Sequence, residues 1–140
     1  MIQITPHMRI FLATGPVDFR KGIDGLVSVC RKALNEDPFS GSMFIFRNKR
    51  RTTLKILLYD GQGFWLFMKR LSRGKFDWWP QSLNKNRTEN EIGNTNTTNT
   101  TNTLNLSPAQ LHLLLWNGDP SSAKIGKNWK RIKETRIPAL

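Results

Sequence analysis

The sequence predicts an α+β fold in which one early helix packs against an antiparallel meander of about four strands. Apolar residues recur at helical spacing between residues 19 and 33. Short runs rich in β-branched and aromatic residues then follow between residues 42 and 79, separated by turn signals. Because the connections between these runs are short, hairpins are expected. A short N-terminal strand precedes this unit, and a C-terminal helix follows a flexible insert.

The N-terminal strand is predicted over residues 9–14, RIFLAT, and a Gly-Pro pair ends it. Asp18 is expected to cap the following helix, since its carboxylate can accept from free N–H groups of the first turn. Gly22 and Gly25 inside that helix each cost roughly 1 kcal/mol relative to alanine, which indicates a close packing contact there. The buried face of the helix is predicted to contain Phe19, Ile23, Leu26, Cys30 and Ala33.

Four strands are expected after the helix, over residues 42–48, 53–59, 64–70 and 75–79. In the first of them, alternation places Met43, Ile45 and Arg47 on one side and Phe44 and Phe46 on the other. Asp60 and Gly61 form a strong turn signal between the second and third strands.

The chain is predicted to have four segments: an α+β core domain over 1–83, a flexible insert over 84–105, a helix over 106–119 and a basic tail over 120–140. The insert contains NTNTTNTTNT at residues 94–103, where no apolar residue offsets the entropy of ordering. Ser107 is the expected cap of the C-terminal helix, with Pro108 at its first position.

Charge is the most informative feature of the composition. The chain has 22 Lys and Arg against 10 Asp and Glu, a formal net charge of +12, which favours anionic partners such as nucleic acid. The single cysteine forms no internal disulfide and suits a reducing compartment. The N-terminus does not resemble a signal peptide, and no window approaches the roughly 18 apolar residues of a membrane span. We therefore expect a cytoplasmic protein without a membrane partner.

No pattern of catalytic residues, metal ligands or cofactor-binding residues is found, so a non-catalytic protein without a cofactor is predicted. The two histidines, His7 and His112, lie far apart without matching ligands, and the usual zinc spacings are missing. The acidic residues among residues 1–80 fit caps, turns and local ion pairs better than a two-metal site. Metal-dependent cleavage of DNA is the least favoured hypothesis.

Two basic clusters fall at predicted turns: one comprises Arg47, Lys49, Arg50 and Arg51, and the other comprises Lys69, Arg70, Arg73 and Lys75. Because alternate turns of a meander share one edge of the sheet, the two clusters are expected to form one surface, the basic hairpin patch. Phosphates bound there would release counterions, so affinity would depend on salt. The alternative is a pair of solvated hairpin tips. Two further cations at the start of the first helix are placed to bind phosphate with help from the helix N-terminus. The predicted nucleic-acid-binding residues are Arg20, Lys21, Arg47, Lys49, Arg50, Arg51, Lys69, Arg70, Arg73 and Lys75.

Aromatic residues lie close to the basic clusters in the sequence. Trp65 and Phe67 share a strand face with Lys69, and Trp78 and Trp79 follow the second cluster. Exposed aromatic rings can stack on bases. Core packing is the more common role and is expected for most of these side chains.

Three motifs in order support a family resemblance: DFRKGIDGL at 18–26, DPFSG at 37–41 and FIFRNKRRTTLKILLYDGQGFWLFMKRLSRGKFDWWP at 44–80. Over residues 6–80 the chain resembles the TnpB-type accessory protein, from the second reading frame, of the IS-sixty-six group of insertion elements. The stretch SPAQLHLLLWNGD at 107–119 resembles the closing helix of that family, whereas the Asn/Thr insert and the tail depart from its compact form.

The resemblance implies a role in transposition beside a separate transposase, and it supplies no catalytic residues. The leading hypothesis is an accessory protein that binds DNA through the basic hairpin patch. The alternative is an adaptor that docks the transposase or another accessory protein of the element without contacting DNA.

Overall fold

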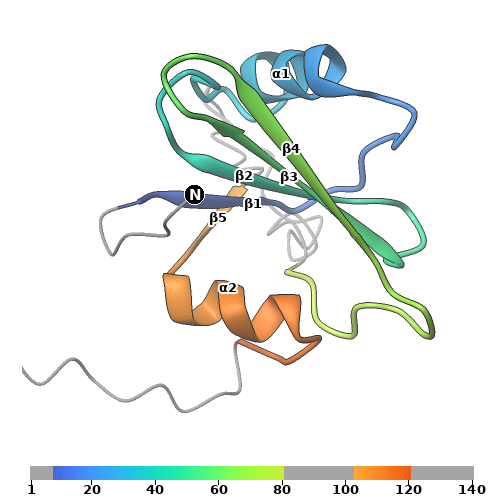
Figure 1. Ribbon diagram of the computed structural model, residues 1–140. Coiled ribbons are helices and arrows are strands. Elements are labelled where there is room, and N and C mark those ends of the chain that lie inside the picture. Colours follow the sequence, from blue (N-terminus) through green and yellow to red (C-terminus); the bar gives the residue numbers. More distant parts are fainter. Residues whose placement is uncertain (1–7, 81–102, 121–140) are drawn as a thin grey trace, which may run out of the picture.

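A five-stranded mixed sheet with one helix on each face forms the fold (Figure 1). The computed structural model describes residues 8–80 and 103–120. The elements in chain order are β1 (Ile10–Ala13), α1 (Ile23–Lys32), β2 (Met43–Arg47), β3 (Thr53–Tyr59), β4 (Phe64–Arg70), β5 (Thr103–Leu106) and α2 (Pro108–Leu115). The predicted α+β class is confirmed.

The strand order is β4-β3-β2-β1-β5. Strands β2, β3 and β4 form the predicted antiparallel meander. Strand β1 pairs parallel with β2, with Ile10 opposite Met43, and α1 is the crossover between the two. Strand β5 pairs antiparallel with β1 and closes that side of the sheet.

Residues 75–79 do not form the predicted fourth strand of the meander. They form an irregular segment that packs on the α2 face of the sheet, where Phe76 and Trp79 are buried. The indole N–H of Trp79 donates to the backbone oxygen of Ala13 at 2.9 Å, a contact with a residue far away in the sequence. Tertiary packing thus decides the conformation of an aromatic-rich run whose composition favours a strand.

Two apolar layers lie on opposite faces of the sheet. The α1 layer contains Phe11, Ala13, Leu26, Cys30, Phe44, Phe46 and Leu57. The α2 layer contains Ile10, Leu12, Met43, Ile45, Leu54, Phe76, Trp79, Leu106, Leu111 and Leu114. The predicted alternation along β2 is confirmed, because its two phenylalanines face α1 while Met43 and Ile45 face α2.

Helix α1 begins later than the sequence predicts, and Asp18 is not its cap. The helix starts at Ile23 with Gly22 as N-cap, and no side chain caps it. The predicted close contact occurs at Gly25, where an added Cβ would lie 2.8 Å from the Cβ of Lys21, but not at Gly22, where an added Cβ would meet nothing within 4 Å. At the other end, Ala33 is the exposed C-cap and not part of the buried face.

Helix α2 has the predicted start. The Ser107 hydroxyl accepts from the backbone N–H of Gln110, and the Gln110 side chain accepts from the Ser107 N–H, which completes a capping box with Pro108 at the first position. Residues 103–105, placed in the insert by the sequence analysis, belong to β5. The rest of the insert, residues 84–102, and the tail beyond Pro120 lie outside the described residues.

Candidate nucleic-acid interface

The two segments that carry the predicted basic clusters lie at one end of the sheet and are joined by backbone hydrogen bonds. The backbone N–H of Leu71, after β4, donates to the oxygen of Thr52 at 2.9 Å, and that of Phe76 donates to the oxygen of Arg51 at 2.7 Å. The segment after β4 is therefore docked on the β2–β3 turn. We call this region the basic end, which comprises Lys49, Arg50, Arg51, Arg70, Arg73 and Lys75.

Asn48 fixes the conformation of the β2–β3 turn. Its side-chain oxygen accepts from the backbone N–H groups of Thr52 and Thr53 at 2.9 and 3.2 Å. Its backbone oxygen accepts from the N–H of Arg51, whose φ of +57° lies in the left-handed region. With the turn held by Asn48, the side chains of Lys49 and Arg50 remain exposed to solvent.

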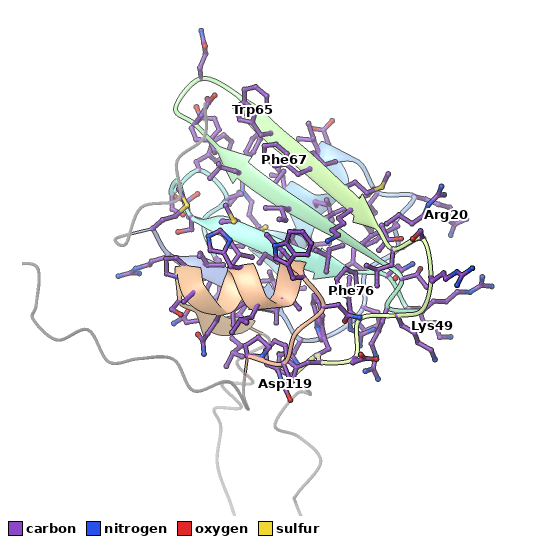
Figure 2. The ribbon with its side chains drawn as sticks, turned by 60° about the horizontal axis from the view of Figure 1, so that its bottom comes forward. Arg20, Lys49, Trp65, Phe67, Phe76 and Asp119 are labelled. Carbon is purple, nitrogen blue, oxygen red and sulfur yellow. The ribbon has the colours of Figure 1, made fainter. Side chains whose placement is uncertain are left out.

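The loop before α1 reaches the same end of the sheet. The N–H of Val17 donates to the oxygen of Arg47, the last residue of β2, at 3.0 Å. Figure 2 shows Arg20 and Lys49 projecting on one side of the molecule, away from Trp65. This loop therefore adds its cations to the surroundings of the basic end.

Lys55 holds that loop in place and was not predicted from the sequence. It is 8% exposed, and its ammonium donates to the backbone oxygens of Phe19 at 2.9 Å and Lys21 at 3.0 Å. The same ammonium lies 5.0 Å from the centre of the Phe19 ring. The signal was present, because Lys55 shares its side of β3 with Thr53 and the buried Leu57.

Asp18 offsets the charge of Arg20. The Arg20 guanidinium donates from Nη2 and Nε to the carboxylate, with the shortest contact at 2.8 Å, and the Arg20 backbone N–H also donates to it. The side-chain hydrogen bond from Arg20 is the main reason that the pKa of Asp18 falls to about 2. Arg20 therefore brings less net charge to a phosphate than an unpaired arginine would.

Arg47 and Lys69, both predicted to bind phosphate, also make internal contacts. The Arg47 guanidinium donates to the Asn48 oxygen at 3.2 Å and lies 5.7 Å from the Trp79 ring centre. Burial, followed by the charge of Arg51, lowers the pKa of Arg47. The Lys69 ammonium donates to the backbone oxygen of Leu115, the last residue of α2, and lies 5.4 Å from the Trp116 ring centre.

Three exposed aromatic side chains, which we call the aromatic stripe, lie along β4 and at the end of α2: Trp65, Phe67 and Trp116, with exposed fractions of 48%, 42% and 84%. The rings of Trp65 and Phe67 are 6.1 Å apart and nearly parallel, with an interplanar angle of 7°. The Trp65 indole N–H donates to the Asp60 carboxylate at 2.7 Å. The core role expected for most of these aromatics is therefore wrong for Trp65 and Phe67, holds for Trp79 and holds in part for Trp78, which packs half-buried against the core.

Comparison with known proteins decides the family. The model of the IS66 Orf2-like protein family, TnpB of IS66, matches residues 8–110. The chain belongs to this family. IS66 Orf2-like proteins are accessory proteins of transposition and are not known to be catalytic.

Two curated relatives of this IS66 Orf2-like protein come from Sinorhizobium fredii, and both are described as uncharacterized. The protein y4jC is 46% identical over 76 residues, which cover 54% of this chain and 65% of that relative. The protein y4hO is 33% identical over 138 residues, which cover 99% of this chain and 96% of that relative. No solved structure is significantly similar.

Within the described part of this IS66 Orf2-like chain, the groups most often used in catalysis are dispersed or buried. Within residues 8–80 and 103–120, no three His, Cys, Asp or Glu side chains gather where a metal ion could bind. Cys30 is fully buried, and burial raises the pKa of its thiol to about 12, so it is a poor nucleophile. No helix in the described part of the chain is long and apolar enough to cross a membrane.

Proposed function

We propose that this IS66 Orf2-like protein serves transposition by binding nucleic-acid phosphates at the basic end. The observation that carries the proposal is the docking of the segment after β4 on the β2–β3 turn through the Leu71–Thr52 and Phe76–Arg51 hydrogen bonds. These bonds fix two basic clusters from different parts of the chain as one surface. A surface held by backbone contacts presents its charge without first being ordered by the ligand.

The chemistry of this surface fits a polyanion better than a single small anion. Its cations are distributed over a turn and a loop and are mostly exposed. Phosphates along a nucleic-acid backbone are spaced, and each one that is neutralised releases counterions. The logarithm of the association constant should therefore fall linearly with the logarithm of the salt concentration, with a slope of about −0.9 for each phosphate contacted in a duplex.

The test compares two double charge reversals by fluorescence anisotropy with a labelled duplex over a salt series. Lys49→Glu with Arg50→Glu alters the exposed turn of the basic end. Arg9→Glu with Lys32→Glu makes the same change in net charge at two exposed residues distant from it. Arg9 directly precedes β1, at the end of the sheet opposite the basic end, and Lys32 is the last residue of α1.

We expect the first double variant to lose about 10-fold or more in affinity and its salt slope to fall by about 2. The control should lose little, because only screened long-range charge changes. Equal losses in the two double variants would show that net charge, rather than the basic end, causes binding.

A second candidate function is a protein adaptor that docks the transposase or another accessory protein of the element. It is favoured by β4, which pairs on one side with β3 and, within the described residues, lies at the edge of the sheet. Edge strands are ready sites for strand addition. A pull-down of the transposase that persists after nuclease treatment, from a variant that has lost DNA binding, would favour this candidate.

A further inference from the structure

We infer that the aromatic stripe is a stacking surface for the bases of single-stranded DNA, an inference that rests on the proposed binding of phosphates at the basic end. Strand β4 joins the two surfaces. It carries Trp65 and Phe67 on the α2 face and ends at Lys69 and Arg70, directly before the cations of the following loop. One extended strand of nucleic acid along β4 would place its bases on the aromatic rings and its phosphates near these cations.

The arrangement of the stripe does not serve the core. Helix α2 packs on β5 and on the central strands through Leu111 and Leu114, while Trp65 and Phe67 lie on β4 beside it (Figure 2). Both rings keep more than two fifths of their surface exposed. Exposed tryptophan and phenylalanine rings on one sheet face are the usual platform for unpaired bases.

Two rings of the stripe, those of Trp65 and Trp116, are also held by contacts that exist before any ligand binds. Hydrogen bonds to Asp60 come from the Trp65 indole at 2.7 Å and from the backbone N–H groups of Gln62 and Gly63 at 2.8 and 2.9 Å. The Lys69 ammonium similarly lies over the Trp116 ring while it donates to the end of α2. A fixed ring loses little conformational entropy when a base stacks on it.

Charge indicates how the DNA strand lies. Hydrogen bonds from Gly63, Trp65 and Gln62 lower the pKa of Asp60, so its carboxylate is ionised beside Trp65 and repels phosphate. Lys69, on the same face of β4, and Arg73, in the loop that follows, lie toward the other end of the strand and attract it. The strand is therefore expected to cross the basic end with its phosphates on the cations and to continue along β4 with its bases stacked on the rings. A duplex cannot bind in this way, because its bases are stacked on each other and face inward.

The experiment measures binding of the full chain to labelled oligothymidylate, to an abasic oligonucleotide of equal length and to a duplex. The double variant Trp65→Ala with Phe67→Ala removes two rings of the stripe. Met68→Ala is the matched control, since Met68 is 65% exposed on the opposite face of the same strand. Circular dichroism melting establishes that each variant folds, and the abasic comparison with the unaltered chain needs no variant.

We expect the unaltered chain to bind oligothymidylate about 10-fold or more tightly than the abasic strand, and the double variant to lose that preference while keeping its salt slope. Met68→Ala should bind like the unaltered chain. Equal binding of the thymidylate and abasic strands would overturn the stacking surface and leave the proposed function intact. Failure to bind any of the three nucleic acids at low salt would overturn both. A double variant that changes only the oligomeric state would assign the stripe to contacts between copies of the chain and overturn the inference.

Discussion

Lys55→Met is the perturbation that tests most directly how the loop before α1 is held. Methionine keeps the apolar stem of Lys55 and removes the ammonium that donates to Phe19 and Lys21 at 2.9 and 3.0 Å. Hydrogen bonds from a charged donor contribute about 1.5–3 kcal/mol each. Part of that gain is offset, because a buried ammonium has lost most of its hydration and because the two freed carbonyls can reach water.

From these terms we expect Lys55→Met to lower the free energy of unfolding by about 2 kcal/mol. With a urea m-value of about 2 kcal/mol/M, the midpoint of unfolding should shift by about 1 M. Urea titration followed by tryptophan fluorescence measures this shift. Lys49→Met is the control, since the exposed turn lysine should change stability by less than about 0.5 kcal/mol.

The same variant should make the loop more accessible to protease. Trypsin cleaves after Arg20 and Lys21, and in the native chain the carbonyls of Phe19 and Lys21 are held by Lys55. Mass spectrometry of the first products should therefore show earlier cleavage at these two sites in Lys55→Met. A midpoint within experimental error of that of Lys49→Met, together with unchanged cleavage, would refute the anchoring role of Lys55.

Two further predictions concern ionisation. The folded-state pKa of Asp18, about 2, lies below its ordinary value of 3.8, so the contribution of the pair with Arg20 to stability is present above the ordinary pKa and is lost as pH falls toward 2. An NMR titration should give a carboxyl midpoint near 2 that rises toward 3.8 in Arg20→Gln, and an unchanged midpoint would contradict the pairing. Cys30, whose buried thiol has a pKa of about 12, should resist iodoacetamide in the native chain at mildly alkaline pH and react in urea, whereas rapid native labelling would contradict its burial.

Local patterns in the sequence predicted those parts of the fold that local chemistry decides. Alternation along residues 43–46 indicated which side chains of β2 face each helix, and this split is confirmed. The Ser107-Pro108 pair predicted the start of α2. Both features depend on residues a few positions apart, where strand geometry and capping act directly.

The same local patterns did not predict which strands pair with each other across long distances in the sequence. Nothing in the RIFLAT run indicates that β1 pairs parallel with β2 on one side and antiparallel with β5 on the other. The conformation of residues 75–79 likewise depends on distant contacts, such as the bond from Trp79 to Ala13. Pairings of this kind depend on which apolar faces meet in the folded chain, and the composition of one segment does not specify its partner.

The structure divides the predicted cations according to where they occur in the chain. Arg47 and Lys69 lie within strands on the α2 face, so alternation directs them toward Trp79 and the end of α2. Lys49, Arg50, Arg73 and Lys75 lie in a turn or a loop, where the backbone leaves them exposed. Cations of strands that face a helix should therefore affect stability when replaced, and cations of turns should affect binding.

Lys69 connects two parts of the molecule. It follows Phe67 on the same face of β4, and it ties the strand to the carbonyl end of α2, where the helix dipole also favours a positive charge. Its ammonium lies over Trp116, so the position of that ring depends on the same contact. Lys69 thus connects the C-terminal helix to the aromatic stripe. An effect of its replacement on nucleic-acid binding would therefore report the geometry of the stripe as well as the loss of one charge.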